Sequence, residues 1–107
     1  MAAVAPADPV LVRFRRDLNA LFSAGVARVV PFGSRARGDW RPESDYDIAV
    51  FLKNPGGLWD ELGRLAHITT GILDDTGAVI SVRPFAERVY DDRSPLMQEI
   101  RTDGVEF

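Results

Sequence analysis

Apolar residues recur along this chain at two spacings, and each spacing predicts one kind of secondary structure. Between residues 10 and 22 they return every three or four positions, which predicts a first helix opened by the pair Asp8-Pro9. Residues 26–32 are apolar or β-branched apart from Arg28, which predicts a mostly buried strand. A second strand is expected over residues 45–52. The apolar stripe expected on the first helix consists of Val10, Phe14, Leu18, Leu21 and Phe22.

The second half of the chain predicts a long helix, a strand and a short final helix. The long helix should run from Leu58 until residues 74–77 end it, with Leu62, Leu65, Thr69, Ile72 and Leu73 at spacings of three and four. Residues 78–83 predict a third strand that Pro84 ends. Ser94-Pro95 predicts the start of the last helix, whose apolar face contains Leu96, Met97 and Ile100. Together these elements predict an α+β fold, a short mixed β-sheet with helices packed mainly on one face.

Length and charge limit the protein class. With 107 residues there is room for one domain, and we expect residues 1–107 to form it, with residues 1–7 as a loose tail. No apolar run approaches the roughly 20 residues of a membrane span, and no signal peptide is evident. The absence of cysteine excludes disulfides, so a cytoplasmic protein is expected. A net charge of -3 attracts neither nucleic acid nor anionic membranes, so neither is expected as a partner.

Candidate phosphate ligands follow the first strand. Gly33 lets the backbone approach a phosphate without an intervening Cβ, and Ser34 adds a hydroxyl and an amide donor. Residues 35–38 predict a helical turn or two whose positive end faces the phosphates. Its two arginines, Arg35 and Arg37, supply guanidinium groups that suit a bound polyphosphate.

Two carboxylates open the second strand. The alternation of a strand puts Asp45 and Asp47 on one face and Tyr46 and the following apolar residues on the other. Carboxylates roughly 7 Å apart on one face repel each other unless a cation lies between them. Such hard oxygen ligands favour Mg²⁺, which typically binds through one or two carboxylates and the phosphates of a nucleotide.

With Gly33-Ser34, ten intervening residues and then Asp45-Tyr46-Asp47, the chain resembles the minimal nucleotidyltransferases of the polymerase-beta-like superfamily. The resemblance covers most of the chain and implies a nucleotidyltransferase-like fold. It also implies transfer of a nucleoside monophosphate, AMP from ATP or the equivalent from another NTP, to a hydroxyl of a partner protein, with Mg²⁺ or Mn²⁺ as cofactor. Asp45 and Asp47 would be the catalytic metal ligands, and the Gly33-Ser34 turn would hold the pyrophosphate. Family members of this size are commonly antitoxins encoded beside a HEPN-type toxin, which implies a helical protein partner.

One position departs from the family pattern. Family enzymes usually add a third carboxylate from the next strand, which helps to bind the metal and deprotonates the acceptor, and Ser81 stands at that position here. A hydroxyl is a poor metal ligand and no general base at neutral pH. Ser81 therefore favours an alternative, a catalytically degenerate module that binds nucleotide weakly or not at all and docks onto a helical partner. The intact Gly33, Ser34, Asp45 and Asp47 favour the enzyme.

Other cofactor and catalytic motifs are not supported. Gly33 and Gly38 have the spacing of a P-loop, but Asp39 and Trp40 follow where Lys and Ser or Thr are required. The only histidine, His67, lies off the apolar stripe of its predicted helix. We expect it to be a solvated helix residue, because nothing positions it in a Ser-His-Asp triad.

Overall fold

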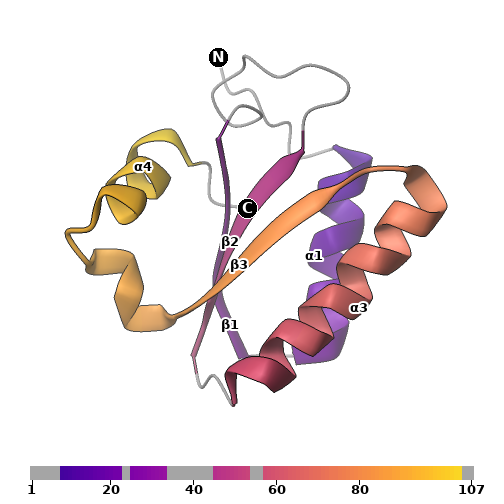
Figure 1. Ribbon diagram of the computed structural model, residues 1–107, viewed down its shortest axis with the longest axis horizontal. Helices are drawn as coiled ribbons and strands as arrows, with labels where there is room; N and C mark the ends of the chain where they lie inside the picture. Colours follow the sequence, from indigo (N-terminus) through magenta and orange to yellow (C-terminus); the bar gives the residue numbers. More distant parts are fainter. Residues whose placement is uncertain (1–7, 23–24, 34–44, 54–56, 105–107) are drawn as a thin grey trace.

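A three-stranded sheet lies between two layers of helices. The computed structural model describes residues 8–22, 25–33, 45–53 and 57–104, and Figure 1 shows the strands between α1 and α3 on one side and α4 on the other. In chain order the elements are α1 (Pro9–Phe22), β1 (Val26–Phe32), β2 (Tyr46–Leu52), α3 (Leu58–Thr76), β3 (Ile80–Ala86), the 3₁₀ helix η2 (Glu87–Asp91) and α4 (Pro95–Asp103). The predicted α+β fold with a short mixed sheet is confirmed.

The sheet has the order β1-β2-β3, with β2 in the centre. β1 pairs with β2 in antiparallel register, so that Phe32 lies opposite Asp47. β2 pairs with β3 in parallel register, so that Asp47 also lies opposite Ser81. Residues 48–52 of β2 are all buried, as expected for a strand covered on both faces. The central strand thus places one carboxylate between β1 and β3.

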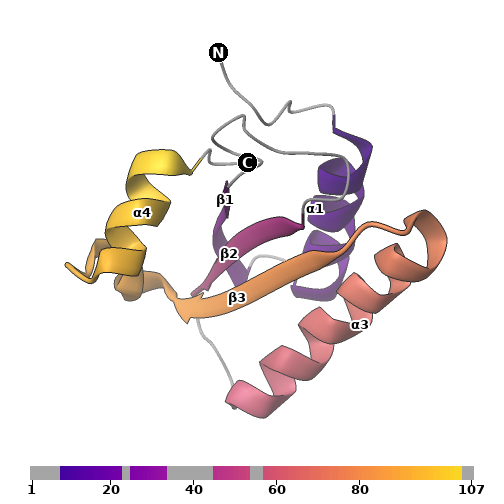
Figure 2. The same cartoon turned by 45° about the horizontal axis from the view of Figure 1, so that its top comes forward.

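Each face of the sheet has its own apolar cluster. The face toward α1 and α3 carries the larger one, in which Tyr46, Ile48 and Val50 of β2 pack with Phe14 of α1 and Leu65 of α3. The other face is covered by α4 and η2, and Figure 2 shows these elements apart from the α1–α3 layer. Its cluster consists of Val30, Phe32, Ala49, Phe51, Met97 and Ile100. The two long helices therefore share one face, and the opposite face is covered by the short α4.

Polar side chains fix where the elements begin. The Asp8 carboxylate accepts a hydrogen bond from the Val10 amide at 2.9 Å, which confirms the predicted cap of α1. The same carboxylate accepts a hydrogen bond from the Tyr46 hydroxyl at 3.0 Å. In α4 the Ser94 hydroxyl accepts from the Met97 amide at 3.2 Å, again as predicted. The start of α1 is thereby tied to the start of β2.

Two glycines end elements with a positive φ that other residues rarely adopt. Gly77 ends α3 at φ 79°, and a Cβ built there would meet no atom within 4 Å. Gly33 follows β1 at φ 77°, and its Cβ would come within 2.5 Å of an Asp47 carboxylate oxygen. Glycine is therefore favoured at residue 33 by both the positive φ and the nearby Asp47 carboxylate, and at residue 77 by the positive φ alone.

The structure corrects the predicted position of Pro84, which lies inside β3 and does not end it. The Tyr46 amide donates to the Val79 carbonyl, so the backbone groups of alternate residues from Val79 onward point toward β2. Pro84 belongs to the alternate residues whose backbone groups point away from β2, toward the open edge of the sheet. Among the described residues, no strand there needs the N–H that proline lacks. Proline is tolerated in a strand at that position.

Two leucines predicted on apolar stripes are largely exposed, Leu21 at 39% and Leu73 at 44%. The buried stripe of α1 is Leu11, Phe14 and Leu18, and Leu21 follows in the last turn beside a groove between α1 and α3. On α3 it is Ile72, the residue before Leu73, that is buried against the sheet, and Leu73 is turned away from the sheet. None of the described helices is long and apolar enough to cross a membrane.

We expect Gly33→Ala to destabilise the fold more than Gly77→Ala. Both variants force a side chain into positive φ, at roughly 1–2 kcal/mol, but only Gly33→Ala also displaces the Asp47 carboxylate. Urea denaturation of both variants measures the difference, and repeating the pair in an Asp47→Ala background should remove it. Equal losses of unfolding free energy in the wild-type background would contradict the close approach of Gly33 and Asp47.

The hydrogen bond between Tyr46 and Asp8 makes a second stability prediction. Asp8→Ala removes both the helix cap and the acceptor of the tyrosine hydroxyl. Tyr46→Phe removes only the hydroxyl and should lower the free energy of unfolding by roughly 1–2 kcal/mol. The double variant should therefore cost about 1 kcal/mol less than the sum of the single variants. Strict additivity in urea denaturation would show that the two residues do not stabilise each other.

Candidate functional site

The predicted site residues that the structure describes meet at one end of the sheet. Gly33 follows the last residue of β1, and Asp47 lies opposite that last residue, Phe32. The backbone of Gly33 passes so close to Asp47 that a Cβ on residue 33 would lie 2.5 Å from a carboxylate oxygen. A turn with a Cβ-free backbone therefore lies directly beside a carboxylate, although 13 residues separate the two in sequence.

The two aspartates lie at the start of β2. Asp45 immediately precedes the strand and is exposed, whereas Asp47 lies within it and is half-buried. Tyr46, between them, is 6% exposed and packs in the α1–α3 cluster, which confirms that it lies on the opposite face. The buried Tyr46 and its hydrogen bond to Asp8 hold this part of the strand and leave the aspartate face toward the Gly33 turn.

Ser81 completes the row across the sheet. In β3 it lies opposite Asp47, it is exposed, and its neighbour Ile80 is 8% exposed on the α1–α3 face. Ser81 therefore shares a face with Asp47, as expected for the position at which the family resemblance implies a third carboxylate. The side chains across this end of the sheet, from β1 to β3, are Phe32, Asp47 and Ser81.

Three predicted phosphate ligands, Ser34, Arg35 and Arg37, lie outside the described residues. Within residues 8–22, 25–33, 45–53 and 57–104, no three histidine, cysteine, aspartate or glutamate side chains gather to form a metal site. The pair of Asp45 and Asp47 thus has two carboxylates and no third from the described part of the chain. Mg²⁺ commonly binds through one or two carboxylates and takes its other ligands from phosphates and water, so the pair fits this ion.

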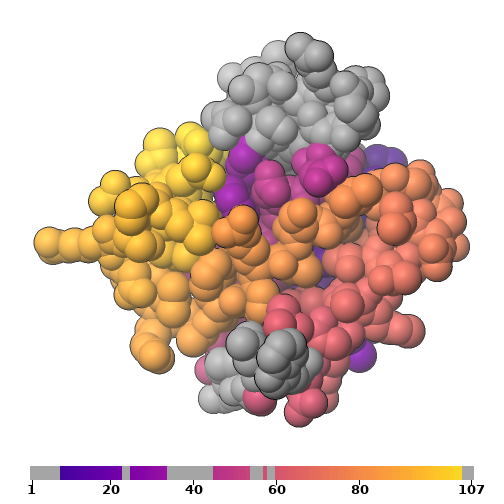
Figure 3. Space-filling model, in the orientation of Figure 1, coloured from indigo at the N-terminus to yellow at the C-terminus, as the bar shows by residue number. Residues whose placement is uncertain are grey.

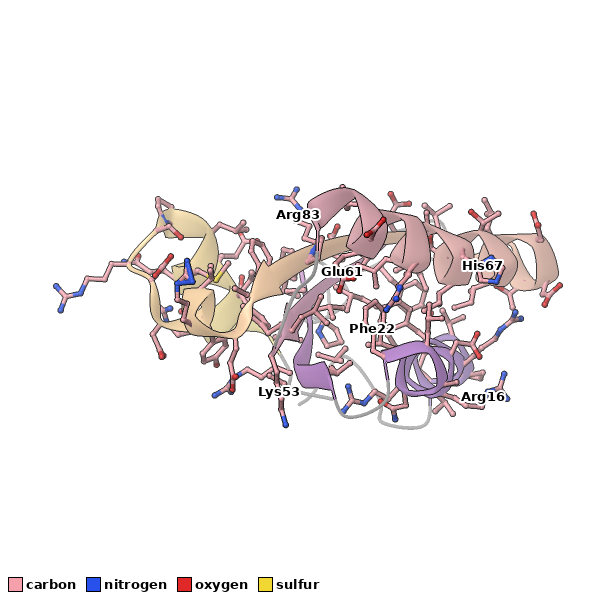
Figure 4. All side chains as sticks on the ribbon, turned by 90° about the horizontal axis from the view of Figure 1, so that it is seen from below. Arg16, Phe22, Lys53, Glu61, His67 and Arg83 are labelled. Carbon is pink, nitrogen blue, oxygen red and sulfur yellow. The ribbon has the colours of Figure 1, made fainter. Side chains whose placement is uncertain are left out.

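A separate groove lies on the far side of the sheet, between α1 and α3. It includes a cavity of about 350 Å³ lined by Arg13, Leu21, His67 and others, and His67 projects from α3 beside it (Figure 4). The guanidinium of Arg13 on α1 donates from Nη1 to Oδ2 of Asp75 on α3 at 2.7 Å, and this hydrogen bond raises the pKa of Arg13. His67 is exposed, as predicted, and the carboxylate of Asp17, which also lines the groove, pairs with Arg13 and Arg16.

The sequence did not indicate which residue holds the aspartates in place. Asp8 was predicted only as a helix cap, and its second hydrogen bond, to Tyr46, joins residues 38 positions apart. The sequence Asp-Tyr-Asp does not indicate which distant residue accepts the hydrogen bond of the tyrosine hydroxyl. The apolar run that follows Tyr46 predicts that it faces the core, but a buried hydroxyl needs an acceptor that only the fold identifies.

Known proteins share both sequence and fold with this chain. A 44-residue stretch is 36% identical to a protein of Methanocaldococcus jannaschii named "Putative protein adenylyltransferase MJ0141", and it covers 41% of this chain and 44% of that protein. This chain thus matches less than half the length of that relative.

Solved structures share the fold at lower identity. A crystal structure of a mutant of the toxin–antitoxin MntA–HpeT matches 89% of this chain and 69% of its own chain, with a TM-score of 0.64 and 14% identity. A toxin–antitoxin crystallised with AMP-PNP matches 94% of this chain and 71% of its own, with a TM-score of 0.63 and 16% identity.

A structure named "Structure of putative minimal nucleotidyltransferase" matches 98% of this chain and 95% of its own, with a TM-score of 0.59 and 24% identity. At these identities the solved structures establish the fold alone. The family is established by sequence, because the model of the nucleotidyltransferase domain matches residues 11–94, which include Gly33, Asp45, Asp47 and Ser81. This chain belongs to the nucleotidyltransferase domain family.

Proposed function

We propose that this protein transfers AMP from ATP to a hydroxyl of a partner protein, in a reaction that depends on Mg²⁺ or Mn²⁺. The observation that carries this proposal is the placement of Gly33 against Asp47 at one end of the sheet, in a chain of the nucleotidyltransferase domain family. The missing Cβ of Gly33 lets the Asp47 carboxylate lie against the turn, so phosphates held by the turn and a metal ion held by the aspartates would be neighbours.

Each group has a role in this proposal. Asp45 and Asp47 bind the divalent ion, which when bound neutralises negative charge on the phosphates. Gly33 and Ser34 hold the outer phosphates, and Arg35 and Arg37 donate to them from the segment that follows. A bond forms between the acceptor oxygen and the α-phosphorus while the bond from that phosphorus to the bridging oxygen breaks. Pyrophosphate leaves with the electron pair.

The fate of the acceptor proton follows from Ser81. No carboxylate stands at this position, so in this chain the hydroxyl proton passes to solvent water, because serine accepts no proton at neutral pH. Ser81 is exposed, which gives water access to that side of the site. Transfer without a nearby base is slower than transfer with one, by a factor of typically 10²–10⁴.

A toxin-like partner is part of the proposal. Two of the solved structures are toxin–antitoxin assemblies, one of them with AMP-PNP, and the relative from Methanocaldococcus jannaschii carries the name of a protein adenylyltransferase. These similarities support the proposal of an antitoxin that acts on a toxin. From the family resemblance of the sequence, we further propose that the acceptor is a HEPN-type helical protein and that the pair acts in the cytoplasm. The experiment that tests this is incubation of the chain with labelled ATP, Mg²⁺ and the product of the neighbouring gene.

A second candidate function rests on Ser81. A chain that lacks the third carboxylate can act by docking onto its partner, with weak nucleotide binding or none. The pair of Asp45 and Asp47 beside Gly33 argues against this alternative, because a chain without catalysis has no structural need for two neighbouring carboxylates at this end of the sheet.

The metal site predicts a thermal shift. Mg²⁺ with ATP at about 100 times its dissociation constant should stabilise the wild type by roughly 2.7 kcal/mol, and Asp47→Ala should lose most of this gain. Asp74→Ala, at an exposed position near the end of α3, is the matched control and should keep it. A metal–nucleotide titration that raises the melting temperature of Asp47→Ala as much as that of the wild type would refute the site.

The departure at Ser81 predicts a gain of function. Ser81→Asp restores a carboxylate opposite Asp47, and the bound cation offsets the repulsion among the three acidic groups. Transfer to the partner should rise, or appear where the wild type shows none, and half-maximal activity should need less Mg²⁺. Ser81→Asn is the control, because asparagine has the size of aspartate without its charge. It should neither raise transfer nor lower the Mg²⁺ requirement. If Ser81→Asp folds but behaves like Ser81→Asn, the position does not limit turnover.

A further inference from the structure

β3 leaves part of the site face uncovered. On β1 and β2 this face is buried beneath α4, with Phe32 at 5% exposure and Ala49 at 0%. On β3 the corresponding residues Ser81 and Arg83 are both exposed. Figure 3 shows β3 as a continuous band of surface atoms between η2 and α3. We call the exposed side chains of Ser81 and Arg83 the β3 strip.

The charge of the β3 strip comes from Arg83. Within the described part of the chain this guanidinium makes no ion pair, no hydrogen bond and no ring contact. Figure 4 shows its side chain projecting outward from the ribbon. Glu61, on α3, is 7% exposed and forms no ion pair with Arg83 among the described residues. Arg83 is thus a positive charge that is available to a ligand.

The register places Arg83 on the side of Asp47 that faces away from the Gly33 turn. Arg83 lies opposite Ala49, one face repeat beyond Asp47, whereas Gly33 follows Phe32, which pairs with Asp47 on the β1 side. The repeat between residues on one face is roughly 7 Å. Phosphates held at Gly33 would lie on the β1 side of Asp47, and a molecule that approaches Asp47 from the β3 side would pass over Arg83.

We propose that the β3 strip receives the acceptor segment of the partner protein and that Arg83 binds a carboxylate of that segment, one or two residues from the acceptor hydroxyl. This inference rests on the proposed transferase function and names the chemistry of its acceptor. A hydroxyl beside Asp45 and Asp47 lies about one face repeat from Arg83, which matches the distance between side chains one or two residues apart in an extended peptide. The acceptor is therefore an acidic segment.

The first test measures steady-state transfer to the partner protein. Arg83→Ala should raise the KM for the acceptor roughly three- to fivefold, as expected for the loss of an exposed charge pair, and Arg83→Glu should raise it further. The KM for ATP and the melting temperature should not change. Raising the salt concentration should weaken acceptor binding by the wild type more than by Arg83→Ala.

Arg88→Ala is the matched control, because Arg88 is an exposed arginine in η2, just beyond β3. It should leave the acceptor KM at the wild-type value. An equal rise in the KM for the acceptor in both variants, or a rise in the KM for ATP in Arg83→Ala, would overturn the proposed role of Arg83.

The second test does not depend on activity. Fluorescence anisotropy compares the binding of a labelled random copolymer of glutamate and tyrosine with that of a copolymer of lysine and tyrosine. The wild type should bind the acidic copolymer more tightly, and Arg83→Glu should reverse the order. If the wild type transfers no AMP, the transferase proposal fails, and this preference still decides whether the β3 strip binds acidic segments. A wild-type preference for the basic copolymer would refute the inference.

Discussion

The close approach of Gly33 and Asp47 is the constraint on which the candidate site depends. A carboxylate oxygen of Asp47 lies 2.5 Å from where a Cβ of residue 33 would be, and φ at this residue is 77°, so any side chain there would be strained and would displace the carboxylate. The antiparallel pairing of Phe32 with Asp47 fixes this contact, and the Tyr46–Asp8 hydrogen bond holds β2 from the opposite face. The site geometry is therefore built into the sheet.

Much of this arrangement could be predicted from the sequence, because it depends on local rules. Strand alternation separates Asp45 and Asp47 from Tyr46, and the caps at Asp8 and Ser94 follow from residue type. The parts that could not be predicted depend on neighbours in space. Pro84 is tolerated because β3 is an edge strand, and strand order is not visible in the residues of β3 alone.

Helix faces show the same limit. A spacing of three or four assigns an apolar residue to a stripe, but the partner elements decide how wide the buried stripe is. In α3 the stripe centres on Leu65, Ile68 and Ile72, so Leu73 is left exposed although it fits the spacing. Leu21 fits its stripe too, yet α1 ends beside a groove that leaves the residue accessible. Periodicity therefore predicts the existence of these helices better than it predicts their buried sets.

The electrostatic balance of the site differs on its two sides. Gly33 offers uncharged backbone beside Asp47, whereas β3 has a neutral serine opposite this aspartate and a free arginine one repeat further. A carboxylate in place of Ser81 would repel an acidic acceptor, and Arg83 would then serve mainly to offset that repulsion. With serine there, the positive charge of Arg83 acts on the acceptor without that opposition. Under the proposed function, the serine that weakens proton removal would also favour binding of an acidic segment, so slow transfer and selective docking would be compatible properties of one site.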